Sequence, residues 1–268
     1  MEEQLFNACS EGKVEEVKKL LLNNPQIDLN WKNKWDNTPL FIACQKGHIE
    51  VVKLLLNEER VDVNKPIGHW TPLSTACSNG HLDVVKLLLN NKKIEINPTS
   101  PKGTPFFLAC ENGHTEVMKL LLNDERVDVN IANEYGTTPF NHVCHLFTFD
   151  RVKQHIEIAK LLLREKKVDI NKANEDGWTP LISSSCSGSI SVLEYMLASG
   201  RNVSLTSKDK KGKTATDHAK KGGYKDVVQL LDSFQKNPSA TRSRLRKELN
   251  LPGMITFILF IFFLDQVS

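Results

Sequence analysis

Hydrophobic positions along the chain fall into pairs of short blocks that are separated by polar stretches. The block at 40–44 is apolar throughout and follows Thr38 and Pro39. A threonine hydroxyl can cap a helix, and proline is tolerated in the first turn because the N–H that it lacks has no partner there. Gly47 predicts the end of this short helix, and the apolar block at 49–56 predicts a second helix. The polar residues that follow suit a projecting hairpin.

This pair of blocks recurs along most of the chain. From Thr38 the sequence reads TPLFIACQKGHIEVVKLLLNEERVDVN, and from Thr104 it reads TPFFLACENGHTEVMKLLLNDERVDVN. A first copy without the Thr-Pro pair, LFNACSEGKVEEVKKLLLNNPQIDLN, starts at Leu5. Steps of 33, 33, 34, 41 and 35 residues separate the Thr-Pro pairs and their last counterpart, which begin at Thr38, Thr71, Thr104, Thr138, Thr179 and Thr214. We therefore expect about seven repeats between residues 4 and 234.

A single repeat cannot bury its own apolar face, so neighbouring repeats must stack into a solenoid. The period of 33 residues and the TPL…GH…LLL…DVN pattern resemble the ankyrin-repeat family. The resemblance implies an all-α solenoid of stacked helix–turn–helix units with projecting β-hairpin loops. We place this domain at residues 1–235 and a tail, first basic and then apolar, at 236–268.

Cysteine recurs once per repeat, five residues after the proline, at Cys44, Cys77, Cys110 and Cys144. Cys9 matches by alignment, and Cys186 is displaced by one residue. Zinc ligands usually come in close pairs such as CxxC, whereas spacing by a whole repeat indicates one packing position that is used repeatedly. We therefore interpret these thiols as small buried hydrophobic groups in a reducing compartment, with no disulfide network and no metal site.

The fifth repeat carries about seven additional residues between His145 and His155. Leu146, Phe147 and Phe149 are apolar in what should be a loop. Two interpretations are open: a lengthened helix whose aromatic rings pack on the repeats, and an exposed docking element. We favour the lengthened helix.

Three histidines lie near this insertion, at His142, His145 and His155, together with Cys144. No second cysteine or nearby carboxylate completes a metal site. We interpret these histidines as structural.

The overall composition adds little to the fold prediction, whereas the distribution of charge along the chain is informative. Hydrophobic residues make up 40% and charged residues 25%, as in ordinary globular proteins, and the net charge is +3. Residues 201–250 are basic, with 13 lysines and arginines against 5 acids. The first residues show no basic start followed by an apolar run, so we expect no secretory signal and a cytoplasmic protein.

Information about a partner must lie at positions that the repeat leaves free. In ankyrin proteins these are the hairpin tip, the residue before Thr-Pro and the two residues after the Ala-Cys step, which form one concave face. The resemblance thus implies a partner-binding set of Lys34, Trp35, Asn37, Gln45, Lys46, Trp70, Ser78, Asn79, Glu111, Asn112, Tyr135, Thr137, Glu175, Asp176, Trp178, Lys210, Lys211 and Lys213.

Aromatic residues are prominent in this set. Trp35, Trp70, Trp178 and Tyr135 are of the types that dominate binding energy at interfaces. Each ring could instead cover a neighbouring hairpin, and the sequence leaves both roles open.

The tail combines a basic segment around Arg242, Arg244, Arg246 and Lys247 with an eleven-residue apolar run at 254–264. The run is shorter than the roughly 20 residues of a membrane span. A tail anchor on the cytosolic side, a helix packed on the last repeat and the end of a truncated product remain alternatives. Basic residues without interleaved aromatics favour a solvated face, so we expect no nucleic-acid binding.

The sequence contains none of the motifs GxSxG, HExxH or CxxC and no glycine-rich phosphate loop. We therefore expect neither an enzyme nor a cofactor. The favoured function is a monomeric adaptor that binds a protein partner on its concave face. The alternative is a membrane-tethered scaffold held through residues 254–264, and an inhibitor that covers an enzyme would use the same face.

Overall fold

The computed structural model describes residues 1–145 and 152–251. Within these residues the chain forms α-helices and no β-strand, and Ile67 and Trp70 make an isolated antiparallel bridge. The helices are α1 (Glu2–Glu11), α2 (Val14–Asn23), α3 (Pro39–Lys46), α4 (Ile49–Leu56), α5 (Pro72–Asn79), α6 (Leu82–Asn90), α7 (Pro105–Glu111), α8 (Thr115–Leu122), α9 (Pro139–Cys144), α10 (Val152–Arg164), α11 (Pro180–Cys186), α12 (Ile190–Ala198), α13 (Ala215–Gly222), α14 (Lys225–Lys236) and α15 (Pro238–Glu248).

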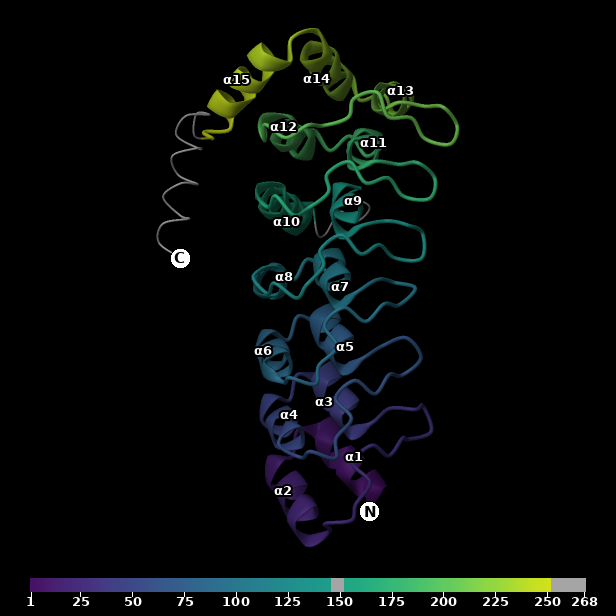
Figure 1. Cartoon of the computed structure of the whole chain (residues 1–268), viewed down its shortest axis with the longest axis vertical. Helices are drawn as coiled ribbons and strands as arrows, with labels where there is room; N and C mark the ends of the chain where they lie inside the picture. The colour runs from purple at the N-terminus through teal and green to yellow at the C-terminus, as the bar shows by residue number, and fades with distance from the viewer. Residues whose placement is uncertain (146–151, 252–268) are drawn as a thin grey trace. The chain divides into compact units, whose positions relative to one another are not determined.

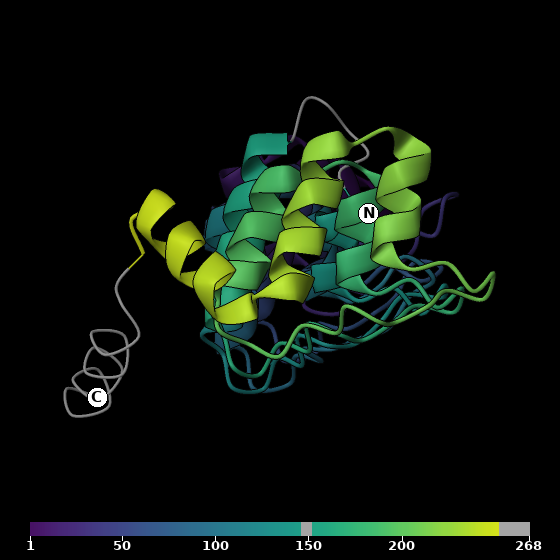
Figure 2. The same cartoon turned by 90° about the horizontal axis from the view of Figure 1, so that it is seen from above.

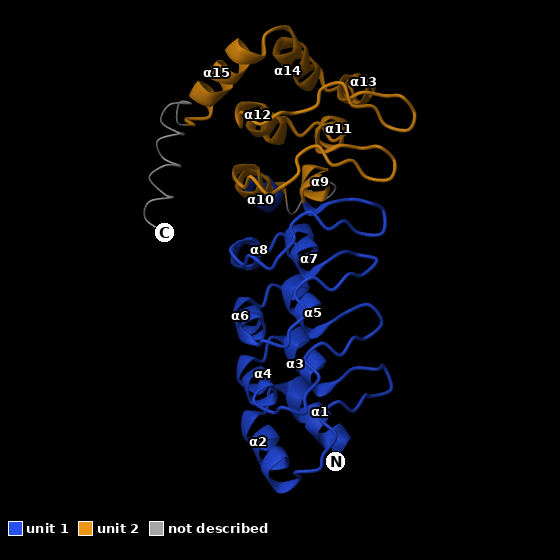
Figure 3. Ribbon diagram, viewed as in Figure 1, with its two compact units in different colours: residues 1–139, 153–158 blue, residues 140–152, 159–268 orange. Residues whose placement is uncertain are grey.

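The chain divides into two compact units (Figure 3). Unit 1 comprises residues 1–139 and 153–158, and unit 2 comprises residues 140–152 and the chain from 159 onward. In unit 1, the first helices of the repeats, α1, α3, α5 and α7, pack on one another in one row. The second helices, α2, α4, α6 and α8, form a second row (Figure 1). In unit 2, α11 packs on α13 and α12 packs on α14. This stacking of helix pairs within each unit confirms the all-α prediction.

The start and the end of each first helix follow from local chemistry, as the sequence predicts. The Thr38 hydroxyl oxygen accepts a hydrogen bond from the backbone N–H of Phe41 at 3.2 Å, and Pro39 occupies the first turn. Gly47 ends the helix with φ 76°, a left-handed conformation that favours glycine. Equivalent threonine caps begin α5, α7, α11 and α13.

The recurring cysteines are buried side chains of the first-helix row, as the sequence analysis proposed. Cys9, Cys44, Cys77, Cys110 and Cys144 are all buried. Burial raises the pKa of the Cys9 and Cys144 thiols to about 12, because the thiolate would lose its hydration. In α11 this position is taken by the buried Ser185, while Cys186 is half-buried at the helix end.

Asparagine side chains at the end of the DVN segment and of its counterparts DLN, EIN and DIN link successive loops. Asn64 donates from Nδ2 to the Lys93 carbonyl at 2.7 Å and accepts from the Glu95 N–H at Oδ1 at 2.8 Å. Asn30, Asn97 and Asn171 make the same pair of bonds to the following loop. The loops are therefore fixed by side-chain amides rather than by the strand ladders that a β-hairpin would contribute.

The irregular fifth repeat has a longer second helix. α10 begins three residues before His155, whose Nε2 donates to the Glu111 carbonyl at 2.9 Å. His155 is buried. In other repeats, His81 and His114 make the same kind of bond to a backbone carbonyl of the preceding repeat, which confirms the structural role of His155. Leu146, Phe147 and Phe149 lie outside the described residues.

The basic segment after the last repeat forms α15, which packs on α12 and α14 (Figure 2). The prediction of a solvated basic face was wrong for Arg246, whose exposed fraction is 8%. Its guanidinium donates from Nη1 to the Ala198 carbonyl at 2.9 Å, so it satisfies the end of α12. No helix among residues 1–145 and 152–251 is long and apolar enough to span a bilayer, and the run at 254–264 lies outside the described residues.

Candidate functional site

The loop tips between repeats are built around one side chain each. Asn33 accepts from the N–H groups of Trp35 and Asn37 at 2.9 and 3.0 Å through Oδ1, and its own N–H donates to the Asn37 carbonyl. Asn133, Asn174 and Asp209 accept the same two backbone bonds in later loops. The loops emerge on one side of the helix rows within each unit (Figure 1). Each tip therefore presents its side chains on a fixed backbone.

Two aromatic residues occupy the same place on such tips in unit 1. Trp35 is 66% exposed and Tyr135 is 63% exposed. Each follows its tip asparagine by two residues, and each has a backbone N–H that donates to that asparagine. The Lys34 ammonium lies 4.2 Å from the centroid of the Trp35 ring, in cation–π contact. These rings face solvent on a rigid support.

The loop before α5 has a different tip. Ile67 and Trp70 exchange two backbone hydrogen bonds at 2.8 and 3.0 Å. Trp70 is half-buried, with the Lys102 ammonium 5.7 Å from its ring centroid. The Trp70 ring is thus less exposed than the rings of Trp35 and Tyr135, and its cation–π contact is with the loop of the next repeat.

The helical members of the predicted set lie at the C-terminal ends of the first helices. Gln45, Lys46 and Asn79 are exposed, whereas Ser78 and Asn112 are half-buried. Asn112 donates from Nδ2 to the Ser78 hydroxyl at 3.2 Å and to the Leu108 carbonyl at 3.0 Å. Part of this surface is therefore already used to join repeats. The backbone carbonyl of Glu111, another member of the set, accepts the bond from His155.

In unit 2, Trp178 lies between two histidine rings. Its ring stacks on His145 with centroids 5.7 Å apart and lies 4.9 Å from the centroid of His218 at a tilt of 58°. Asn141 donates from Nδ2 to the Trp178 carbonyl at 2.6 Å. Of the two roles that the sequence left open for Trp178, these contacts favour a packed ring that holds neighbouring loops.

His218 is itself fixed by a buried carboxylate. Its Nε2 donates to Oδ2 of Asp209 at 2.8 Å. The N–H of Lys213, the His218 ring and the N–H of Lys211 hold the pKa of Asp209 below its usual value. Asp209 is therefore satisfied internally, while Lys210, Lys211 and Lys213 on the same tip are exposed.

The structure thus collects the predicted residues into two groups. The set from Lys34 to Thr137 lies in unit 1, and Glu175, Asp176, Trp178 and the three tip lysines lie in unit 2. None of these side chains is buried. The sequence analysis missed Asn141, His145 and His218 as neighbours of Trp178, because their contact depends on how three loops and helices meet. The described residues contain no cluster of three metal-ligating side chains.

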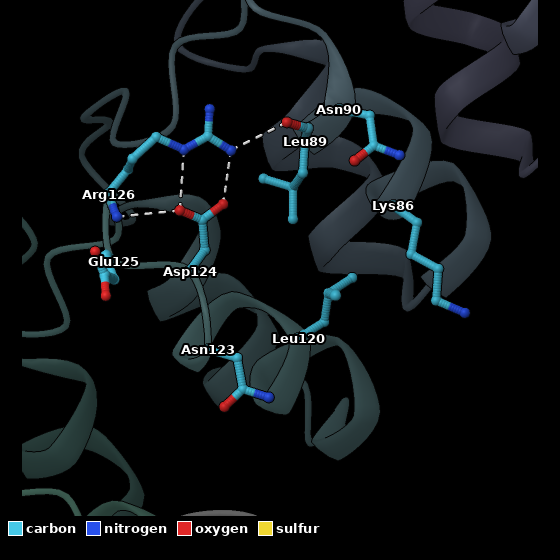
Figure 4. A pocket seen from close by; sticks show the side chains of 8 residues that line it. All are labelled: Lys86, Leu89, Asn90, Leu120, Asn123, Asp124, Glu125 and Arg126. Atoms are coloured by element: carbon cyan, nitrogen blue, oxygen red, sulfur yellow. Dashed lines mark hydrogen bonds and ion pairs between the residues drawn. The ribbon is translucent and has the colours of Figure 1, made fainter. Parts of the chain in front are cut away.

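A cavity of about 610 Å³ opens between α6 and α8 in unit 1 (Figure 4). Both cationic side chains of its lining already have partners. Arg126 makes two bonds to the Asp124 carboxylate at 2.7 and 3.0 Å and donates to the Leu89 carbonyl, while Lys86 pairs with Asp83. Arg60 and Arg201 make similar bonds to carbonyls of the preceding repeat. Arg126 therefore joins repeats rather than recognising a ligand.

The helix pairs and the loops between them define a repeat protein. The family model for ankyrin repeats matches in three copies, over residues 5–100, 94–174 and 151–241. The chain belongs to the ankyrin-repeat family, whose repeats are generally protein–protein interaction modules.

Two solved structures show the same fold at low identity. The ankyrin repeat domain of human ASB11 is 23% identical, with a TM-score of 0.66 over 85% of this chain and 96% of that domain. The ankyrin repeat domain of Bcl-3, a member of the IkappaB family, is 19% identical, with a TM-score of 0.69 over 84% of this chain and 97% of that domain.

Proposed function

We propose that this protein is a non-enzymatic adaptor that holds a protein partner on the loop tips and on the C-terminal ends of the first helices. The observation that carries the proposal is the equivalent placement of Trp35 and Tyr135. Both rings are largely exposed, and both stand on tips whose backbone is fixed by an asparagine.

The physical argument rests on what such rings contribute to an interface. An exposed indole or phenol offers a large apolar area together with a polar group, and these residue types dominate binding energy. A fixed backbone loses little conformational entropy when a partner binds. The exposed Gln45 and Lys46 at the end of α3 extend the same surface with polar groups.

The state of the recurring cysteine thiols favours a binding role over an enzymatic one. The five recurring cysteines are buried, and the raised pKa of their thiols disfavours the thiolate that a nucleophile requires. We place the protein in the cytoplasm, because buried free thiols suit a reducing compartment, and we take it to act as a monomer.

The test is affinity capture from cell extract, followed by mass spectrometry, with three forms of the protein. Wild type is compared with the Trp35→Ala/Tyr135→Ala double variant. The control is Leu22→Ala, which removes another exposed apolar side chain of unit 1, 81% exposed at the far end of α2. Circular dichroism establishes that all three are folded.

We expect at least one partner to bind wild type and Leu22→Ala and to be lost or strongly reduced with the double variant. If a folded double variant keeps every partner, the tips do not form the binding surface. If both variants lose the same proteins equally, the captured proteins bind apolar surface without specificity, and the proposal also fails.

A further inference from the structure

We infer that unit 2 contains a site for an acidic peptide segment with an apolar side chain, in a cavity bordered by α11, α13 and the tip of the loop before α13. This inference rests on the proposed function and assigns a ligand chemistry to one part of the binding surface. The cavity measures about 590 Å³ and lies beside Trp178, Cys186 and His218. Figure 1 shows α11 and α13 side by side at this position.

Four lysines surround the cavity. Lys211 and Lys213 come from the loop tip, and Lys220 and Lys221 come from the last turn of α13. All four are exposed, and within residues 1–145 and 152–251 no ion pair forms to any of them. Their charge is thus available to a ligand.

The two carboxylates of the same cavity offset only part of the charge of the four lysines. Asp209 accepts from the His218 ring and from two backbone N–H groups of its own tip. Asp217 caps α13, where it accepts from the Thr214 N–H at 2.9 Å and from the Thr214 hydroxyl at 2.8 Å. Both acids hold the cavity walls and remain charged, and four lysines against two carboxylates leave the rim with a net positive charge.

The interior of the cavity is partly apolar, so an apolar side chain fits it better than a small anion does. Trp178 and Cys186 contribute apolar surface, and the Trp178 ring is held in place by His145 and His218. This cavity distinguishes the four lysines from lysines on an ordinary exposed helix surface. An apolar side chain in the cavity, with carboxylates on either side of it, would satisfy both the interior and the rim.

The test measures fluorescence anisotropy of a fluorescein-labelled peptide in which glutamates flank a central phenylalanine, added to the full chain. The variants are Lys220→Gln/Lys221→Gln and Lys211→Gln/Lys213→Gln. The control is Lys225→Gln/Lys236→Gln on α14, which removes the same amount of exposed charge from unit 2 outside the cavity. A peptide with glutamine in place of glutamate tests the charge requirement.

We expect each cavity variant to weaken binding about fivefold and the control to change it less than about twofold, because exposed ion pairs each contribute modestly. The glutamine peptide should bind at least about tenfold more weakly, and added salt should weaken the glutamate peptide.

Cys186 supplies a second readout that locates the ligand. The other five cysteines are buried, so N-ethylmaleimide should modify Cys186 first in the native protein, and Cys186→Ser identifies this reaction. Each rate is compared with and without peptide in the same protein, because burial raises the pKa of the Cys186 thiol while Lys221 lowers it, and removal of Lys221 changes the rate by itself. At a peptide concentration close to the wild-type Kd, the glutamate peptide should slow the modification in wild type and in the α14 control, and clearly less in the Lys220→Gln/Lys221→Gln variant.

Several results would overturn the inference. These are equal binding of the two peptides, no binding of either, equal losses in the cavity and control variants, or no protection of Cys186. Binding of phosphatidylserine vesicles through the same lysines, without peptide binding, would assign the site to a lipid surface instead. Because Trp35 and Tyr135 lie in unit 1, any of these results leaves the capture experiment on the adaptor surface unaffected.

Discussion

The imidazole of His81 lies directly against Gly47 of the preceding repeat. A Cβ at Gly47 would stand 2.6 Å from Nδ1 of His81, and Nε2 of the same ring donates to the Gln45 carbonyl at 3.0 Å. The same relationship joins His48 to Gly12 and His114 to Gly80. Each of these three glycines thus has two functions: it ends the first helix of its repeat, and its missing side chain leaves room for the histidine of the next repeat.

Gly47→Ala should destabilise unit 1 by about 2 kcal/mol. Part of the loss is the left-handed backbone at φ 76°, which costs a residue with a Cβ about 1 kcal/mol. The rest comes from displacement of the His81 ring from its hydrogen bond. Urea denaturation measures the change. The control is Gly68→Ala, because Gly68 has φ 56° with nothing within 4 Å of an added Cβ, so only the backbone cost applies. Equal losses in the two variants would contradict the role assigned to the His81 contact.

Asn64→Ala should destabilise unit 1 by about 2 kcal/mol, because it removes both hydrogen bonds from one loop to the next. The backbone amide of Glu95 loses its acceptor in this variant, so we expect its hydrogen exchange to become faster. Asn90→Ala, at the exposed end of α6, is the matched control and should leave exchange at Glu95 unchanged. Unchanged exchange at Glu95 in the Asn64 variant would show that the amide has another partner.

The stability of unit 2 should fall on acidification because of His145. Burial lowers its pKa from 6.5 to about 4, since the charged ring would lose hydration beside Trp178. Between these two pH values the unfolded chain binds the proton and the folded chain does not. Stability is therefore lost as the pH drops from about 6.5 towards 4. The ring is partly exposed, so we expect a loss of about 1 kcal/mol after screening by water.

His145→Phe isolates this contribution. Phenylalanine keeps an aromatic ring next to Trp178 but does not titrate. Thermal unfolding at a series of pH values should show a shallower decline between pH 6.5 and 4 for the variant than for wild type. Parallel curves would mean that His145 is protonated as readily in the folded protein as in the unfolded chain.

The elements that the sequence predicts correctly are those determined by local chemistry. Thr38, Pro39 and Gly47 fix the start and the end of α3 with atoms of that repeat alone. The regular spacing of Cys44 and its counterparts identifies them as buried, because a position that recurs once per repeat meets the same neighbours each time.

What the sequence did not reveal depends on contacts between distant segments. Arg246 stands in a basic stretch that looks solvated, and its burial follows only from the packing of α15 on α12 and α14. The role of Trp178 depends on His145 and His218, which lie in other repeats. Trp35 stands at a loop tip and Trp178 directly before Thr-Pro, and neither position by itself indicates whether the ring is packed or exposed.

The tryptophans should therefore differ sharply in their effect on stability. Trp178→Ala removes a ring that contacts His145 and His218, and we expect a loss of about 3 kcal/mol in unit 2. Trp35→Ala removes a ring that is largely exposed, and we expect a change within about 0.5 kcal/mol in unit 1. Urea unfolding followed by circular dichroism compares the two variants. A large loss for Trp35→Ala would mean that its ring supports the fold, and would remove the basis for treating it as a free binding residue. A negligible loss for Trp178→Ala would instead indicate that its ring is free to bind a partner, as its position before Thr-Pro would predict.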